Sequence, residues 1–273
     1  MRFVYARYQV DGLSAADLAG KLPVILAELQ SIRQEAGKYV WAMGDIGERT
    51  VEGEKLLFGR LGKTARETGR ADSDDPVHSF SREPVQGRKA ACSNFFIHPP
   101  SSIIVLEDKP LLPGGKFLKR FKQFWETSQA AEINFDFLKN ETEIFAIINR
   151  WDKITAAKFN LASTGSQPRE DFAPLDHLIK KSTARRAGFK FEGGCGGLAK
   201  DDSVIQQGVS MSAAGYGEFS LKGVENGSKT GLDSESLLLV DELVEFDDLV
   251  SLAPVVLSGI REMLTQINNP KAA

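Results

Sequence analysis

Hydrophobic residues recur along the chain at two spacings, which together predict a mixture of strands and helices. Apolar side chains at every second position predict half-buried strands at residues 3–8, 132–137, 189–192 and 218–222. Parallel sheets buried on both faces would instead show continuous runs of Val, Ile and Leu. The alternation therefore favours an α+β fold with mainly antiparallel sheets, in which helices cover one face.

Apolar residues spaced three or four positions apart, together with capping residues, predict helices in segments between these strands and at the C-terminal end. Ser14 is a predicted N-cap, with Asp17 in the capping-box position, for a helix that ends at Gly37. Pro23 lies too deep for a first turn, so it predicts a kink or a later helix start. Asn140 is placed to cap a second helix, over residues 141–151. A regular apolar stripe predicts a long C-terminal helix over residues 251–268. Further strands are expected over residues 38–45, 55–60, 94–98, 102–107 and 153–161.

The composition changes between Leu61 and Lys89, where apolar residues become rare and charged residues, Gly and Pro dominate. Such a segment buries too little apolar surface to offset the entropy of ordering, so it predicts a basic flexible loop or linker. We therefore expect an N-terminal α+β region over residues 1–90 and a second α+β region over residues 91–273, although both could belong to a single domain.

Composition also limits the cellular setting. The 273 residues have a formal net charge of -3 and include two cysteines, Cys92 and Cys195, which are too few for a disulfide framework. No apolar run approaches the roughly 18 residues that a transmembrane helix requires, and the first residues lack the features of a secretory signal. We therefore expect a cytoplasmic protein without membrane insertion.

The most concentrated positive charge lies in the middle of the chain. A helix predicted over residues 171–187 carries four cations, the next strand adds a fifth, and no acid occurs between His177 and Lys190. The expected phosphate-contacting residues are Lys180, Lys181, Arg185, Arg186 and Lys190. Contacts of this kind give affinity for nucleic acid without reading its sequence.

A second basic segment precedes it and has amphipathic character. Phe117, Phe121 and Trp125 are spaced to form the apolar side of a helix, while the other side carries Lys116, Lys119, Arg120 and Lys122. Such a helix can meet nucleic acid, an acidic partner or a membrane surface, or it can simply expose its lysines to solvent.

Motifs for catalysis or cofactor binding are weak. Gly194 to Ala199 fits a loose dinucleotide-binding pattern, but the preceding strand alternates and Lys200 is followed by Asp201, so the Walker pattern fails. The three histidines are far apart in the chain and none stands in a metal-binding spacing. Cys92 and His98 could form a nucleophile pair, although no oxyanion motif lies nearby. We expect no cofactor and no bound metal, and a binding protein rather than an enzyme.

The order of elements resembles the Rex-type phage exclusion proteins. The resemblance rests on the N-terminal strand, the strand-helix-strand unit over residues 152–193, the polar strand Tyr216–Lys222 followed by Glu225, Asn226 and Gly227, and the closing helix. It implies a dimeric, non-specific DNA-binding protein of phage defence, with a fold similar to recombination-associated nucleoid proteins.

Composition and resemblance together predict a homodimer that binds double-stranded DNA through a basic surface and acts in phage defence or exclusion. Two alternatives stay open. The chain could be a metal- or nucleotide-dependent nuclease or effector, or it could be a component of a defence complex that binds a partner protein. The sequence does not distinguish DNA from RNA.

Overall fold

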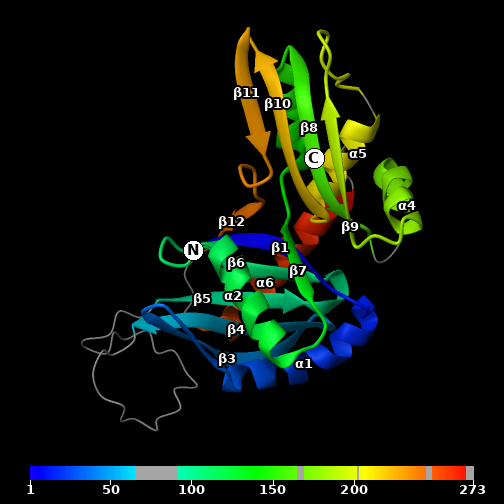
Figure 1. Cartoon of the computed structure of the whole chain (residues 1–273). Coiled ribbons are helices and arrows are strands. Elements are labelled where there is room, and N and C mark those ends of the chain that lie inside the picture. Colours follow the sequence, from blue (N-terminus) through cyan, green and yellow to red (C-terminus); the bar gives the residue numbers. More distant parts are fainter. Residues whose placement is uncertain (66–90, 165–168, 202, 244–247, 269–273) are drawn as a thin grey trace. The chain divides into compact units, whose positions relative to one another are not determined.

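The computed structural model describes residues 1–65, 91–164, 169–201, 203–243 and 248–268 (Figure 1). These residues belong to two compact units. The first comprises Met1–Val4, Tyr8–Asn134 and Val240–Ile260, and the second comprises Tyr5–Arg7, Phe135–Leu239 and Arg261–Ala273. The units therefore do not divide at residue 90, because residues 91–134 belong with the first unit.

The larger sheet has the strand order β12-β1-β6-β5-β4-β3-β2, and β7 also pairs with β1. The registers of β2 to β6 are antiparallel throughout, as the alternating pattern predicts. These strands are β1 Arg2–Val10, β2 Arg33–Ala36, β3 Tyr39–Val51, β4 Glu54–Ala65, β5 Ala91–His98, β6 Ile103–Glu107, β7 Ile133–Phe137 and β12 Val240–Glu242.

Helix α1 (Ala15–Ser31) begins as predicted, because the Ser14 side chain accepts a hydrogen bond from the Asp17 N–H. Pro23 lies inside this helix. The predicted end at Gly37 is wrong, since the helix stops at Ser31 and β2 follows. Gly37 instead occupies the turn between β2 and β3 with φ 60°, a conformation that favours glycine.

Helix α2 (Gly114–Ser128) packs its aromatic side on the larger sheet, as its amphipathic pattern predicts. The Phe95 ring of β5 meets Phe117 and Phe121 at centroid distances of 5.8 and 5.5 Å. Between β5 and β6, the short 3-10 helix Pro99–Ser101 forms the turn. The aromatic side of α2 therefore forms part of the core of this unit, and the sheet is buried on its other face as well, since Phe95 and Phe96 are both fully buried.

The second unit contains a four-stranded antiparallel sheet in the order β11-β10-β8-β9. Helix α5 lies on one face, where Gly208 approaches the Phe159 ring so closely that a Cβ atom there would lie 2.6 Å from the ring. Asn140 caps α3 as predicted, by accepting a hydrogen bond from the Glu143 N–H. These elements are α3 Glu141–Arg150, β8 Lys153–Ala162, the 3-10 turn Glu170–Phe172, α4 Ala173–Lys181, β9 Arg186–Glu192, α5 Ser203–Ala213, β10 Gly217–Glu225 and β11 Ser228–Asp233.

The predicted helix over residues 171–187 is wrong in its C-terminal half. Helix α4 ends at Lys181, and Thr183 adopts φ 55°, which a continuing helix does not allow. Arg186 is already the first residue of β9 and pairs with Ala162 of β8. The four cations predicted to share one helix therefore lie on a helix end, a turn and a strand.

The predicted α+β class with antiparallel sheets and a long C-terminal helix is confirmed. Helix α6 runs over Leu249–Asn268, and Asp248 caps it by accepting hydrogen bonds from the Ser251 backbone and side chain. The predicted basic loop begins later than expected, because residues 61–65 belong to β4, and its remainder lies outside the described residues. Within the described part of the chain, no helix is long and apolar enough to cross a membrane.

Candidate nucleic-acid interface

Helix α2 presents two of the predicted cations to solvent. Lys116 and Lys119 are exposed, and neither forms an ion pair with any residue that the structure describes. Arg120, one turn after Lys116, is partly covered and donates a hydrogen bond to Gln123 Oε1 at 2.6 Å. Residues three and four apart are neighbours on a helix surface, so these three cations form one group, the α2 surface.

The Arg120 guanidinium lies 4.9 Å from the centre of the Trp41 ring system. Trp41 lies on β3 directly opposite Lys63 of β4, whose ammonium group lies 5.5 Å from the same ring system and 4.9 Å from the Tyr39 ring. Lys63 is only 8% exposed and donates a hydrogen bond to the Leu111 carbonyl. Cation–π contacts of this kind hold cationic side chains in place beside the sheet.

Sequence reasoning missed Trp41 and Lys63, because cross-strand pairing and the position of α2 decide their meeting. The indole N–H of Trp41 is buried without a hydrogen-bond acceptor among the described residues. Lys38 adds an exposed ammonium group 5.6 Å from the Tyr39 ring. Cations and aromatic rings are therefore gathered at one edge of the larger sheet.

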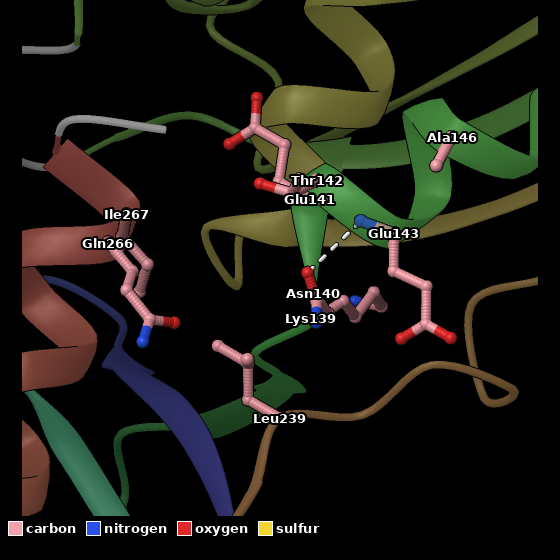
Figure 2. Close-up of a pocket in the computed structure, with 9 residues that line it drawn as sticks. All are labelled: Lys139, Asn140, Glu141, Thr142, Glu143, Ala146, Leu239, Gln266 and Ile267. Carbon is pink, nitrogen blue, oxygen red and sulfur yellow. Dashed lines mark hydrogen bonds between the residues drawn. The ribbon is translucent and has the colours of Figure 1, made fainter. Parts of the chain in front are cut away.

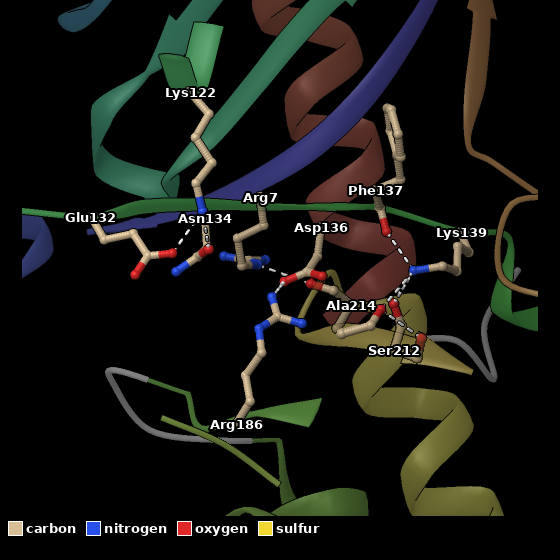
Figure 3. A network of polar contacts seen from close by, with 11 residues as sticks. Arg7, Lys122, Glu132, Asn134, Asp136, Phe137, Lys139, Arg186, Ser212 and Ala214 are labelled. Carbon is tan, nitrogen blue, oxygen red and sulfur yellow. Dashed lines mark hydrogen bonds and ion pairs between the residues drawn. The ribbon is translucent and has the colours of Figure 1, made fainter. Parts of the chain in front are cut away.

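Lys122, the fourth cation predicted on α2, is engaged within the protein. Its ammonium group lies 2.7 Å from the Glu132 carboxylate and 3.0 Å from Asn134 Oδ1 (Figure 3), and it lies 3.7 Å from the Glu126 carboxylate. Its contribution to binding an external phosphate is therefore offset by the carboxylates beside it.

The predicted cations at the end of α4 have diverse surroundings. Lys180 pairs with Asp176 at 2.7 Å, one turn earlier, and the Asp176 carboxylate is buried by its contacts with Thr164. Lys181 and Arg185 are exposed. Lys190 of β9 pairs with Glu192 at 2.6 Å, and this hydrogen bond lowers the pKa of Glu192. These residues lie on a helix end, a turn and a strand, and two of them are paired with acids.

Arg186 has a structural partner. Its guanidinium pairs with the carboxylate of Asp136, which is only 5% exposed (Figure 3). Burial raises the pKa of Asp136, while the charge and the hydrogen bond of Arg186 oppose that shift. This cation compensates a buried charge and is thus poorly placed to bind phosphate.

Lys139 is the most deeply buried cation close to this pair. Its ammonium group donates to the carbonyl oxygens of Phe137, Ser212 and Gly217 at 2.8 to 3.0 Å (Figure 3). Burial lowers the pKa of Lys139 to about 8, although Asp136 acts in the opposite direction. All three ammonium hydrogens have acceptors, so Lys139 serves to hold three chain segments together.

A cavity of about 380 Å³ lies at the start of α3. Figure 2 shows the side chains around it, which are Lys139, Asn140, Glu141, Thr142, Glu143, Ala146, Leu239, Gln266 and Ile267. Glu141 is held by Arg169 at 2.9 Å and by the Ser210 hydroxyl at 2.5 Å, while Glu143 is exposed. Two carboxylates at this helix start disfavour an anionic ligand.

The glycine cluster forms a tight turn. Gly194 bridges to Gly197, which has φ 81°, and a Cβ atom on Gly193 would lie 2.7 Å from the Gly197 backbone. The next helix, α5, begins only at Ser203. The dinucleotide-binding interpretation needs a helix that opens directly from the glycines, so the geometry does not favour it.

The remaining nucleophile and metal candidates are also weak. Burial raises the pKa of Cys92, which disfavours its thiolate. His98 contacts Ser101 through Nδ1 at 2.8 Å, and its Nε2 lies 2.8 Å from Glu54. Among the described residues, no group of three or more His, Cys, Asp and Glu side chains could hold a metal ion.

A family model described as "Domain of unknown function (DUF4747)" matches residues 25–242, which is well over half of the chain. The matched residues include α2, β3 and the whole four-stranded sheet. No curated protein matches the chain.

Proposed function

The chain belongs to the family described as a domain of unknown function, DUF4747, and from the geometry of its own residues we propose that it binds nucleic acid. The proposed contact is the α2 surface, and the proposed ligand is the phosphate backbone of double-stranded DNA. The observation that carries this proposal is the position of Arg120 against Trp41, beside two exposed lysines that form no ion pair with the described residues.

Arginine is suited to this role because its planar guanidinium both stacks on aromatic rings and presents several donors to a phosphate. Here the Trp41 ring system and Gln123 limit the freedom of Arg120 before any ligand arrives. A cation that is already ordered loses less conformational entropy on binding. Lys116 and Lys119 add two charges that no described carboxylate neutralises.

Binding at this surface would be independent of base sequence. Phosphate contacts give affinity and register, whereas specificity requires side chains that reach base edges in a groove. A role in phage defence, a homodimeric assembly and a cytoplasmic location belong to the same proposal and rest on the resemblance to exclusion proteins.

A salt titration tests the proposal. Anisotropy of a labelled 20-base-pair duplex of arbitrary sequence would be measured from 25 to 200 mM salt for the native chain and for Lys116→Gln with Lys119→Gln. Each phosphate contact contributes roughly 0.9 to the magnitude of the slope of log affinity against log salt concentration. Because this variant lacks two such contacts, the magnitude of its slope should be smaller than that of the native chain by about 1.8.

The control replaces two other lysines. Lys122 is paired with acids, and Lys21 is exposed on α1, so Lys122→Gln with Lys21→Gln changes the net charge equally. We expect this control to retain nearly all of the native salt slope. Absence of duplex binding at 25 mM salt, or equal losses in the two variants, would overturn the proposal.

A further inference from the structure

The four-stranded sheet of the second unit has two chemically distinct faces. On the face toward α5, Phe159 pairs with Phe189 of β9 and with Phe219 of β10. Phe191 contacts Phe159 in an edge arrangement at 6.3 Å. Because side chains alternate along a strand, the opposite face receives Lys158, Asn160, Ser220 and their neighbours.

Three lysines meet on that opposite face, which we name the lysine face. Lys158 of β8 lies directly opposite Lys190 of β9. On the other side, Lys158 lies opposite Ser220 of β10, so Lys222 is its diagonal neighbour two residues further. All three lysines are exposed. Strand geometry therefore places the three side chains side by side.

This arrangement has an energetic cost within the free protein. Like charges directly opposite each other on neighbouring strands are destabilising. Glu192 pairs with Lys190 at 2.6 Å, but neither Lys158 nor Lys222 has an ion-pair partner in the part of the chain that the structure describes. Glu192 also attracts Lys158 at longer range, but Lys158 and Lys222 remain two adjacent cations without a direct ion pair among the described residues, and an external anion would relieve their repulsion.

From this juxtaposition we propose that the lysine face, with Lys158 and Lys222 at its centre, is a second docking surface for the phosphate backbone of a nucleic-acid duplex. Charge complementarity selects an anionic partner. Among the described residues of these strands, no aromatic ring lies on this face, because the phenylalanines of β8, β9 and β10 lie on the α5 side. Without a ring on which bases could stack, backbone contact with a duplex is favoured over binding of a single strand.

Three acids share the lysine face, and one of them, Glu192, lies opposite Ala156 of β8, close to Lys190 and diagonal to Lys158. Glu218 lies opposite Asn160, and Asp233 lies opposite Ser220, so neither is directly across from a lysine. Of the three lysines, Lys158 and Lys222 are therefore the two without a direct ion pair among the described residues. Ser220 and Asn160 add a hydroxyl and an amide donor beside these lysines, groups that also hydrogen-bond to phosphate oxygens.

The inference rests on the proposed function for its ligand class, but it concerns different residues in a different unit. The test variant is Lys158→Gln with Lys222→Gln, measured in the same duplex titration and against the same control, Lys122→Gln with Lys21→Gln. Loss of two phosphate contacts should lower the salt slope by about 1.8. The thermal midpoint should stay equal or rise, because the change relieves repulsion.

The outcomes separate this inference from the proposed function. A native salt slope in the Lys158→Gln, Lys222→Gln variant, together with a reduced slope in the Lys116→Gln, Lys119→Gln variant, would overturn only the lysine face. A native chain that binds no duplex would overturn both proposals. Unchanged duplex binding with lost binding of polyglutamate would identify an acidic polypeptide as the occupant and would also overturn the lysine face as a nucleic-acid site.

Discussion

Replacing Arg186 by glutamine should destabilise the second unit, because this arginine neutralises the buried carboxylate of Asp136. The Asp136 side chain is 3% exposed and that of Arg186 is 26% exposed. Removing one partner of a buried ion pair typically costs about 3–5 kcal/mol, since the other charge is left without compensation. Because Arg186 is partly exposed, solvent screens the pair, so we expect Arg186→Gln to lower the free energy of unfolding by about 3 kcal/mol.

The loss of stability in Arg186→Gln should increase as pH rises. Burial already raises the folded-state pKa of Asp136 above its ordinary value of 3.8, and removing Arg186 raises it further. An acid whose pKa is higher in the folded state loses stability as pH rises through that pKa. The destabilisation of Arg186→Gln should therefore be largest at pH 7 and should shrink as pH falls toward 3.8.

Urea unfolding followed by circular dichroism, at pH 7 and at pH 4, measures both effects. A double-mutant cycle with Asp136→Asn tests the cause: the double variant should be more stable than Arg186→Gln alone, because it contains no uncompensated charge. The reasoning is refuted if Arg186→Gln unfolds at the native urea midpoint. If that same variant also loses duplex binding, Arg186 is a binding residue, as the sequence had indicated.

Two further predictions concern the interior of the second unit. The pKa of Lys139 is about 8 in the folded state, against an ordinary value of 10.5 in the unfolded chain. Between about pH 8 and pH 10.5 the unfolded chain therefore binds more protons than the folded chain, so the free energy of unfolding should rise with pH. The rise, at most about 3 kcal/mol, should disappear in Lys139→Met, and equal pH slopes of the urea midpoint for both proteins would contradict it. Gly223→Ala would place a Cβ atom 2.1 Å from the Trp151 ring and should cost about 1–3 kcal/mol. Gly231→Ala on β11 is the control, because its Cβ atom would lie 3.5 Å from the nearest atom, an ordinary contact distance. If both substitutions lowered the thermal midpoint equally, overpacking against Trp151 would not be the cause.

Helix α2 shows what a local pattern can predict. Its apolar positions identify the side that packs on β5, and the lysines on its other side follow from the same 3.6-residue period. The pattern does not reveal that Arg120 meets Trp41, which lies far away in the sequence. That contact depends on how the helix is placed over the sheet.

The central basic segment shows where local reasoning fails. Lys180, Lys181, Arg185 and Arg186 lie within seven residues, and their proximity favoured a single helix. The chain turns at Thr183, and β9 gains hydrogen bonds and apolar packing by joining β8, which outweighs the local preference for helix. Arg186 is thereby directed to Asp136, fifty residues earlier in the chain.

By itself, the sequence determined the α+β class, most of the strands, the caps at Ser14 and Asn140 and the amphipathic side of α2, because each depends on residues within a few positions. Only the tertiary structure decided which cations are compensated. Ion pairs such as Arg186 with Asp136, and the alignment of Lys158 beside Lys190 and Lys222, depend on strand register between distant segments. Charge is a local property of the sequence, but its compensation is a property of the folded chain.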